Sequence, residues 1–298
     1  MRVHTAAPMR HPRSHFGSAV HGGKLYVFGG GGENFQSLDS VEVYDPGADR
    51  WKERTPMTAS RSGIACATVG DRIYVMGGGF KRPDGSFDFK SIVEAYLPAE
   101  DRWEPAPSLL MRHDAPAAAV VDDEIFLFGG HHPDAEGGPL TDPAFDFCER
   151  LEKGGRQWRE IAPMPTARFS LCAVPMPDGI WAMGGGAFRD GTFNNLDLIE
   201  VYDPLGGVWG LSRTRLPWAA AGLYAALHNG HLYVAGGNDG NGISSRLARW
   251  TGATWEKLPD LPEGRVMGAM VSVGDALLIA GGRTPDGKSV TGTMWRVG

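Results

Sequence analysis

The stretch YVFGG at Tyr26–Gly30 recurs five more times along the chain, each time as an apolar run that ends in two glycines. The later copies end at Gly77-Gly78, Gly129-Gly130, Gly184-Gly185, Gly236-Gly237 and Gly281-Gly282. Successive first glycines lie 48, 52, 55, 52 and 45 residues apart. A repeat of short strands with a period of about 50 residues is typical of a β-propeller, in which each repeat forms one four-stranded blade. We therefore expect an all-β fold with six blades of four antiparallel strands.

Each repeat contains four segments that are predicted to be strands. The first is a run of small residues such as Phe16–Val20, and it ends in a two-residue turn such as Gly22-Gly23. Residues of this kind tolerate the positive φ angles of tight hairpins. The second strand ends at the double glycine, the third is clearest in SVEVYDP at Ser40–Pro46, and the fourth opens with a tryptophan such as Trp51.

The sixth repeat stops after its third strand, at TMWRVG, where Trp295 takes the aromatic position of that strand. The missing piece is found at the other end of the chain, because VHTAAPM at Val3–Met9 aligns with WKERTPM at Trp51–Met57. We expect the N-terminal strand, about residues 2–7, to complete the last blade and close the ring. The repeats follow one another without a linker, so we expect a single domain over residues 1–298.

Composition narrows the classes of partner. The net charge of −6 and the isoelectric point of about 5.8 lack the basic footprint of a nucleic-acid-binding protein. No charged-then-apolar leader opens the sequence, and no apolar stretch approaches the ~20 residues of a membrane span. We expect a soluble cytoplasmic monomer without a nucleic-acid or membrane partner. Cys66, Cys148 and Cys172 lack CxxC spacing and are predicted to be buried free thiols.

The loops between second and third strands vary most in length, and they share one end of the blades, here called the top face, with the segments that precede the first strands. Variable loops on a fixed scaffold usually carry binding chemistry. Arginines recur on this face at the start of the first strand: Arg13, Arg61, Arg112, Arg168 and Arg265. Four of them precede the first glycine by 16 residues and Arg112 by 17. Guanidinium groups around the mouth of one channel would attract carboxylates or phosphates.

Blade five has Ala220 in place of the recurring arginine. Further candidate ligand-binding residues lie just past the double glycines or close to Ala220: Arg283, His131, Asn238, Phe80, Phe188 and Trp218. The three aromatic residues would supply an apolar wall.

The arginines also fit a structural role. Glutamates stand in the third strand of blades one to four, each of which also has one of these arginines: Glu42, Glu94, Glu149 and Glu200. Blade five lacks both partners, with Ala220 and Ala248, whereas blade six breaks the pattern with Arg265 opposite Thr293. An Arg–Glu pair inside each blade would produce this covariation, and Arg265 and Arg283 would then be the freer charges.

The chain resembles Kelch-repeat proteins. The resemblance lies in the double glycine after an apolar strand, in the Tyr and Trp spacing of VYDPGADRW at Val43–Trp51, and in the Pro-Met pair before the next blade. It covers essentially the whole chain as six Kelch repeats and implies a propeller. The same scaffold hosts enzymes, peptide receptors and sugar-binding proteins, so it does not fix the function.

Two kinds of Kelch protein suggest functions. Receptors that recruit substrates to ubiquitin ligases bind an acidic peptide through arginines at the positions of the repeat that correspond to Arg61 and Arg168. Those receptors also carry BTB and BACK domains, which we do not find in this sequence, so we do not expect a ligase-adaptor role. Sialic acid epimerases have a similar six-bladed ring and work through arginine and acidic residues in its mouth.

We therefore expect a Kelch-type binding protein whose arginine-rich top-face pocket recognises an acidic peptide of a partner protein or a small carboxylated molecule. The alternative is an enzyme of the isomerase or epimerase type, acting on a carboxylated sugar or metabolite in the same pocket. The sequence identifies no catalytic residue, and no cofactor is expected. A lower-ranked alternative is a metal site that draws on four histidines and three nearby acids: His15, His113, His131, His132, Asp134, Glu136 and Asp142.

Overall fold

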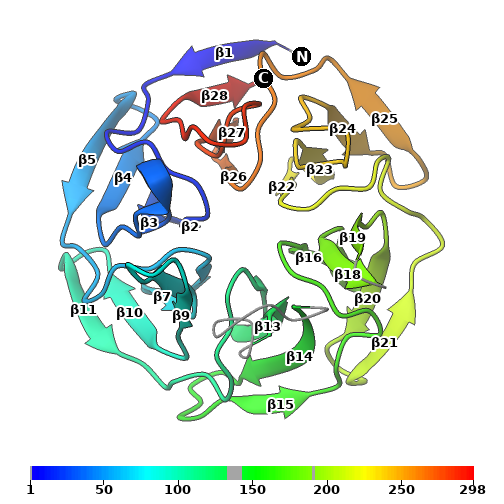
Figure 1. The fold of residues 1–298 in the computed structure, drawn as a ribbon, viewed down its shortest axis with the longest axis horizontal. Helices are drawn as coiled ribbons and strands as arrows, with labels where there is room; N and C mark the ends of the chain where they lie inside the picture. The colour runs from blue at the N-terminus through cyan, green and yellow to red at the C-terminus, as the bar shows by residue number, and fades with distance from the viewer. Residues whose placement is uncertain (1, 133–142, 190–191) are drawn as a thin grey trace.

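The computed structural model is a ring of six four-stranded antiparallel blades around a central channel (Figure 1). It describes residues 2–132, 143–189 and 192–298. The first strand of each blade lies beside the channel, and the fourth lies at the outer rim. The predicted all-β six-bladed fold is confirmed. Among the described residues the helical element is one 3-10 turn, η1 (Glu33–Phe35), and no helix there is long and apolar enough to cross a bilayer.

The blades follow one another in chain order. Blades one and two contain, from the channel outwards, β2 (Gly17–His21), β3 (Lys24–Phe28), β4 (Val41–Asp45) and β5 (Arg50–Arg54), then β6 (Ala65–Val69), β7 (Arg72–Met76), β10 (Val93–Leu97) and β11 (Arg102–Pro105). Blades three and four contain β12 (Ala117–Val121), β13 (Glu124–His131), β14 (Ala144–Leu151) and β15 (Arg159–Ile161), then β16 (Cys172–Met176), β17 (Gly179–Met183), β20 (Ile199–Asp203) and β21 (Val208–Leu211). Blade five contains β22 (Tyr224–His228), β23 (His231–Ala235), β24 (Leu247–Trp250) and β25 (Trp255–Leu258).

Blade six is built from both ends of the chain. Its inner strands are β26 (Ala269–Val273), β27 (Ala276–Ala280) and β28 (Met294–Val297), and its outer strand is β1 (Val3–Ala6). β1 pairs antiparallel with β28, with Val3 opposite Val297 and Ala6 opposite Met294. Figure 1 shows the blue N-terminal strand lying against the red C-terminal one. The N-terminal strand therefore completes the last blade, as the alignment of Val3–Met9 with an outer-strand segment predicted.

Two of the variable top-face loops contain strands that the sequence analysis did not predict. In blade two, β8 (Gly79–Lys81) pairs with β9 (Phe87–Phe89), and in blade four β18 (Gly186–Arg189) pairs with β19 (Thr192–Asn195). In blade three, β13 and β14 continue beyond the double glycine. These extensions lengthen the wall around the mouth of the channel.

Tryptophans at the outer strands connect neighbouring blades. The Nε1 of Trp51 donates a hydrogen bond of 2.8 Å to the backbone carbonyl of Ala7. Equivalent bonds run from the other outer-strand tryptophans, Trp103, Trp158, Trp209 and Trp255, to the carbonyls of Thr55, Pro107, Ala162 and Arg215. The bonds of Trp51, Trp158 and Trp209 are partly buried and satisfy a polar group that packing between blades takes away from water.

The double glycine lies at the seam between blades. In blade five, Gly236 has a φ of +64°, and a Cβ placed on it would stand 2.4 Å from the carbonyl oxygen of Arg265 in blade six. The next residue, Gly237, donates its N–H to that same carbonyl at 2.8 Å. The first glycine is thus needed because no side chain fits, whereas the second provides a backbone bond to the next blade.

Candidate functional site

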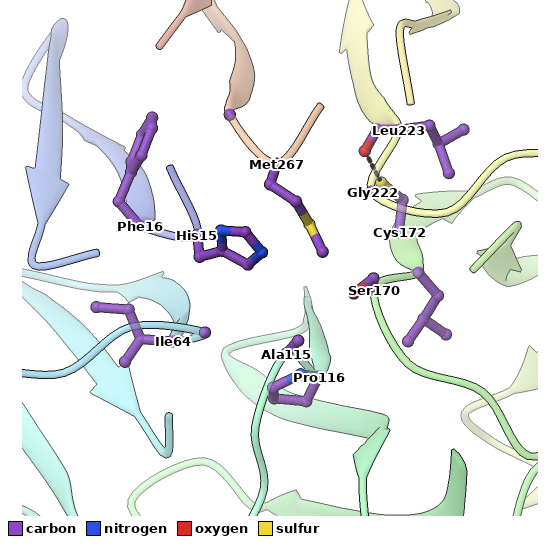
Figure 2. Close-up of a pocket in the computed structure, with 13 residues that line it drawn as sticks. His15, Phe16, Ile64, Ala115, Pro116, Ser170, Cys172, Gly222, Leu223 and Met267 are labelled. Carbon is purple, nitrogen blue, oxygen red and sulfur yellow. Dashed lines mark hydrogen bonds between the residues drawn. The ribbon is translucent and has the colours of Figure 1, made fainter. Parts of the chain in front are cut away.

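Six residues, one from each blade, form a ring at the top of the channel: His15, Gly63, Ala115, Ser170, Gly222 and Met267. All six have φ angles between +52° and +66°. Each donates its backbone N–H to the carbonyl of the ring residue in the preceding blade, at distances of 2.7 to 3.0 Å. Figure 2 shows the side chains of His15, Met267 and Ser170 around the middle of this ring. This circle of hydrogen bonds fixes the floor on which a ligand would rest.

A cavity of about 440 Å³, here called the top-face pocket, opens above the floor. It shares His15, Gly63, Ser170 and Met267 with the ring. Most of its remaining wall is aromatic and comes from blades one, two and four: Phe35, Phe87, Phe89, Phe169 and Phe188. A concave, mostly apolar site with a few polar groups is the usual form of a binding site for small molecules or anchor side chains.

An Asp–His pair forms the polar side of the top-face pocket. The Nδ1 of His131 lies 2.8 Å from Oδ2 of Asp114, and the His131 ring stacks on Phe169 with 4.0 Å between centroids. Because an ionised carboxylate can only accept, Nδ1 carries a proton, and Nε2 is an acceptor whenever the ring is neutral. Nε2 has no hydrogen-bond partner among the described residues, so this acceptor remains available to a ligand.

His15 and Ser170 are the other polar side chains at the floor. Burial, together with the nearby Arg283 and His131, lowers the pKa of His15 to about 3, so its ring is neutral at pH 7. Its Nδ1 is 2.9 Å from Oγ of Ser14. Ser170 is only 6% exposed, and within the described part of the chain its Oγ has no hydrogen-bond partner. A buried hydroxyl without a partner is costly, which makes Ser170 a second candidate contact for a ligand.

Three of the predicted ligand-binding arginines do not reach this pocket. Arg13, Arg61 and Arg168 are fully buried inside their blades. Each lies 2.6 Å from a glutamate of the third strand, and the partners are Glu42, Glu94 and Glu200. Burial lowers the pKa of each guanidinium, and the paired glutamate opposes that shift. The expectation that these groups ring the mouth does not hold, because they form the internal pairs that the covariation within the chain indicated.

In blade three, the place of the arginine is taken by His113 rather than Arg112. The buried His113 ring contacts the carbonyl of Gly129 at 2.6 Å through Nδ1 and Oε1 of Glu149 at 3.0 Å through Nε2. Arg61 likewise bonds the carbonyl of the first glycine of its blade. Arg112 is half-buried one position earlier. His113, not Arg112, lies 16 residues before the first glycine of its blade, as the arginines of the other blades do. The assignment of Arg112 to this position of the repeat was therefore wrong.

Blade five uses a tryptophan at the same place. The buried Trp218 donates its Nε1–H to the carbonyl of Gly236 at 3.0 Å, and the guanidinium of Arg246 lies 5.0 Å from its ring centroid. Trp218 therefore fills the gap left by Ala220 and does not line the top-face pocket. The prediction of an apolar wall at Trp218 is corrected accordingly.

Arg265 and Arg283 behave differently from each other. Arg265 is 2% exposed, pairs with Glu263 at 2.6 Å and stacks on Trp295, so the expectation of a freer charge fails there. Arg283 is half-buried, and its guanidinium carbon lies 3.7 Å from the centroid of Phe35, a residue of the pocket wall. Burial lowers the pKa of Arg283, and Asp286 opposes that shift. Arg283 is thus the predicted arginine that borders the pocket.

Of the other predicted ligand-binding residues, some line the pocket and some do not. His131 and Phe188 line the pocket, whereas Phe80 is 39% exposed on β8 and Asn238 is exposed and bonded to the N–H of Gly240. Sequence reasoning missed most of the lining residues, among them Phe35, Phe87, Phe89, Asp114, Phe169 and Ser170. The alternation in Phe87–Phe89 was a usable signal, because it is a strand pattern within a loop that was treated as irregular.

The described residues contain no group of three or more His, Cys, Asp or Glu side chains placed to hold a metal ion. His132 packs against Phe145, with 5.1 Å between ring centroids. Asp134, Glu136 and Asp142 lie outside the described residues. Cys66, Cys148 and Cys172 are free thiols whose pKa values burial raises, so none carries the thiolate of a reactive cysteine.

Comparison with known proteins finds similarity to Kelch-repeat proteins. The model of the Kelch motif matches residues 12–58 and 60–110. Human Kelch-like protein 23 is 26% identical over 228 residues, which are 76% of this chain and 37% of that protein. Human Kelch-like protein 34 is 30% identical over 233 residues, 78% of this chain and 34% of that protein. The chain therefore spans little more than a third of these relatives.

A more distant relative is β-scruin of Limulus polyphemus, which is 29% identical over 146 residues, 49% of this chain and 15% of that protein. Among solved structures, one described as the structure of YjhT superposes with a TM-score of 0.79 at 20% identity and covers 97% of this chain and 95% of its own. At that identity the superposition supports the fold alone.

Proposed function

Because the chain belongs to the Kelch-repeat β-propeller family, we propose that it is a binding protein whose top-face pocket receives an aromatic group that carries an anionic group. Kelch-repeat proteins generally act as protein-interaction modules, so a segment of a partner protein is the first ligand to consider. A small carboxylated molecule has the same chemistry. The observation that carries the proposal is the convergence of five phenylalanines on one cavity of about 440 Å³.

The anionic part of the ligand is supported by two cations on one pocket residue. The Arg283 guanidinium lies 3.7 Å, and the Lys81 ammonium 5.8 Å, from the centroid of the Phe35 ring. Neither side chain has an ion pair among the described residues. A carboxylate at the rim would meet the Arg283 charge, with Lys81 adding to the positive potential around Phe35, while the apolar body of the ligand fills the aromatic cavity.

This proposal is tested with phenylacetate, which joins a phenyl ring to a carboxylate. We expect Arg283→Gln to weaken its binding about tenfold or more, because a hydrogen bond to a charged group contributes about 1.5–3 kcal/mol. Isothermal titration calorimetry measures the affinity. Arg102→Gln is the matched control, because Arg102 is an exposed arginine at the outer rim that pairs with Glu100 and Glu104.

Equal affinities for wild type and Arg283→Gln would remove Arg283 from the proposal. No heat from phenylacetate, together with no binding of a peptide that carries an aromatic residue between two glutamates, would contradict the proposed function itself.

One observation favours a second candidate, an enzyme of the epimerase type acting on a carboxylated sugar. The neutral His15 and the Asp114–His131 pair both line the pocket, and proton transfer requires groups of this kind. If this candidate holds, the protein interconverts epimers of sialic acid or a related sugar acid, and His131→Gln abolishes the reaction. Proton NMR of the sugar measures the rate, and a rate equal to that without protein argues against the enzyme.

A further inference from the structure

We propose that the aromatic group taken up by the top-face pocket is a phenol, whose hydroxyl donates a hydrogen bond to Nε2 of His131. This inference rests on the proposed function and deepens it by naming the group that enters the cavity. The ligand is therefore distinguished from a plain phenyl group by a single hydroxyl.

The first support is the fixed state of the His131 ring. Its Nδ1–H is held by Asp114 at 2.8 Å, and its backbone N–H is held by the carbonyl of Asp114 at 2.7 Å. Stacking on Phe169 at 4.0 Å restrains the ring plane. The tautomer and the orientation are thus set before a ligand arrives, so Nε2 offers a preorganised acceptor to a hydroxyl.

The second support is Ser170, which follows Phe169 in the chain and borders the same part of the pocket. Its Oγ is buried without a partner among the described residues. A phenol oxygen that donates to His131 keeps a lone pair, and the Ser170 hydroxyl, which no solvent reaches in its present rotamer, can donate to it after rotation about the Cα–Cβ bond. The ligand would then satisfy a buried polar atom that otherwise remains unpaired.

The third support is the shortage of other polar partners on the wall. The Ser62 hydroxyl is used by the carbonyl of Gly79, and Nδ1 of His15 contacts Ser14. Beside His131 and Ser170, the described side chains of the wall therefore offer Nε2 of His15 and Oδ1 of Asp114 to a ligand. A polyol would bury several hydroxyls against phenylalanine rings without partners, and each would cost free energy. A ligand with one hydroxyl on a flat apolar ring fits a wall of many phenylalanine rings and few polar atoms better than a polyol does.

The experiment compares 4-hydroxyphenylacetate with phenylacetate by isothermal titration calorimetry on the full chain. In the wild type we expect the hydroxylated acid to bind about tenfold more tightly or better, since a site built to hydrogen-bond a hydroxyl rejects the analogue that lacks it. In His131→Phe, which keeps an aromatic ring against Phe169, the ratio of the two affinities should fall to about one. His4→Phe, on the exposed edge strand β1, should keep the wild-type ratio.

The outcomes separate the two proposals. Equal affinities of the hydroxylated and the plain probe in the wild type, for the two acids and for the peptide pair described below, overturn the phenol inference and leave the proposed function standing. These measurements use the wild-type chain, so they do not depend on the folding of a variant. If neither acid binds to the wild type and the aromatic peptides flanked by glutamates do not bind either, the proposed function fails and the inference fails with it. A wild-type ratio that persists in both His131→Phe and His131→Gln overturns the role of His131.

The phenol has two possible sources, a tyrosine of a partner protein and a free phenolic acid. An acetylated, amidated peptide with one tyrosine between two pairs of glutamates is compared with its phenylalanine counterpart. Preference for the tyrosine peptide, with tighter binding than 4-hydroxyphenylacetate, identifies a partner's tyrosine as the source. Tighter binding of the free acid identifies a small phenolic ligand. Failure of both hydroxylated probes to exceed their counterparts overturns the inference.

Discussion

Arg61→Ala is expected to lower the free energy of unfolding by about 3–5 kcal/mol, because it leaves the buried carboxylate of Glu94 without its cation. Arg61 is fully buried, its Nη2 lies 2.6 Å from Glu94, and its Nη1 donates to the carbonyl of Gly77 at 2.7 Å. The substitution therefore removes a charge partner and a backbone hydrogen bond in one step. Urea denaturation followed by tryptophan fluorescence measures the loss.

Two controls separate the buried pair from a general effect of losing an arginine. Arg102→Ala removes an exposed arginine from the outer strand of the same blade and should cost no more than about 1 kcal/mol. In the Arg61→Ala background, Glu94→Ala should cost much less than it does in the wild type, because the unpaired carboxylate is already present. Additive effects of the two substitutions would show that Arg61 and Glu94 do not depend on each other.

The fold could be predicted because its requirements repeat in the backbone. Every blade needs a residue without a Cβ where its second strand meets the next blade, as at Gly236, and an N–H for the next blade's carbonyl, as at Gly237. Five of the six seams also use a tryptophan bond such as the one from Trp51 to Ala7. Constraints that recur six times leave a period in the sequence, and the period defines the blades.

The site was predicted less well, because spacing gives the position of a residue but not the direction of its side chain. The phase of Arg61 was correct, yet its guanidinium points into the blade toward Glu94. The two residues after this phase, such as Phe169 and Ser170 in blade four, line the mouth instead. They differ from blade to blade, so no repeat marks them. Phe35 lies in the 3-10 turn η1 of blade one, and Phe87 lies in a hairpin that recurs, among the described residues, in blade four alone.

Gly236→Ala is expected to lower the free energy of unfolding by about 4 kcal/mol. The left-handed backbone at Gly236, with a φ of +64°, costs a non-glycine residue about 1–2 kcal/mol. The new Cβ would also stand 2.4 Å from the carbonyl oxygen of Arg265, which is backbone and cannot rotate away. Relief requires blades five and six to separate slightly, which adds about 1–3 kcal/mol of overpacking and weakens the bond from Gly237.

Gly230→Ala in the same blade is the matched control for this prediction. Gly230 has a φ of +76° in the turn between β22 and β23, but a Cβ there would meet nothing within 4 Å. Its substitution should therefore show the backbone penalty alone, about 1–2 kcal/mol. Chemical denaturation of the two variants isolates the steric contribution of the seam as their difference. Equal losses would mean that backbone conformation, rather than contact between blades, requires glycine at position 236, and the physical explanation of the double-glycine repeat would have to change.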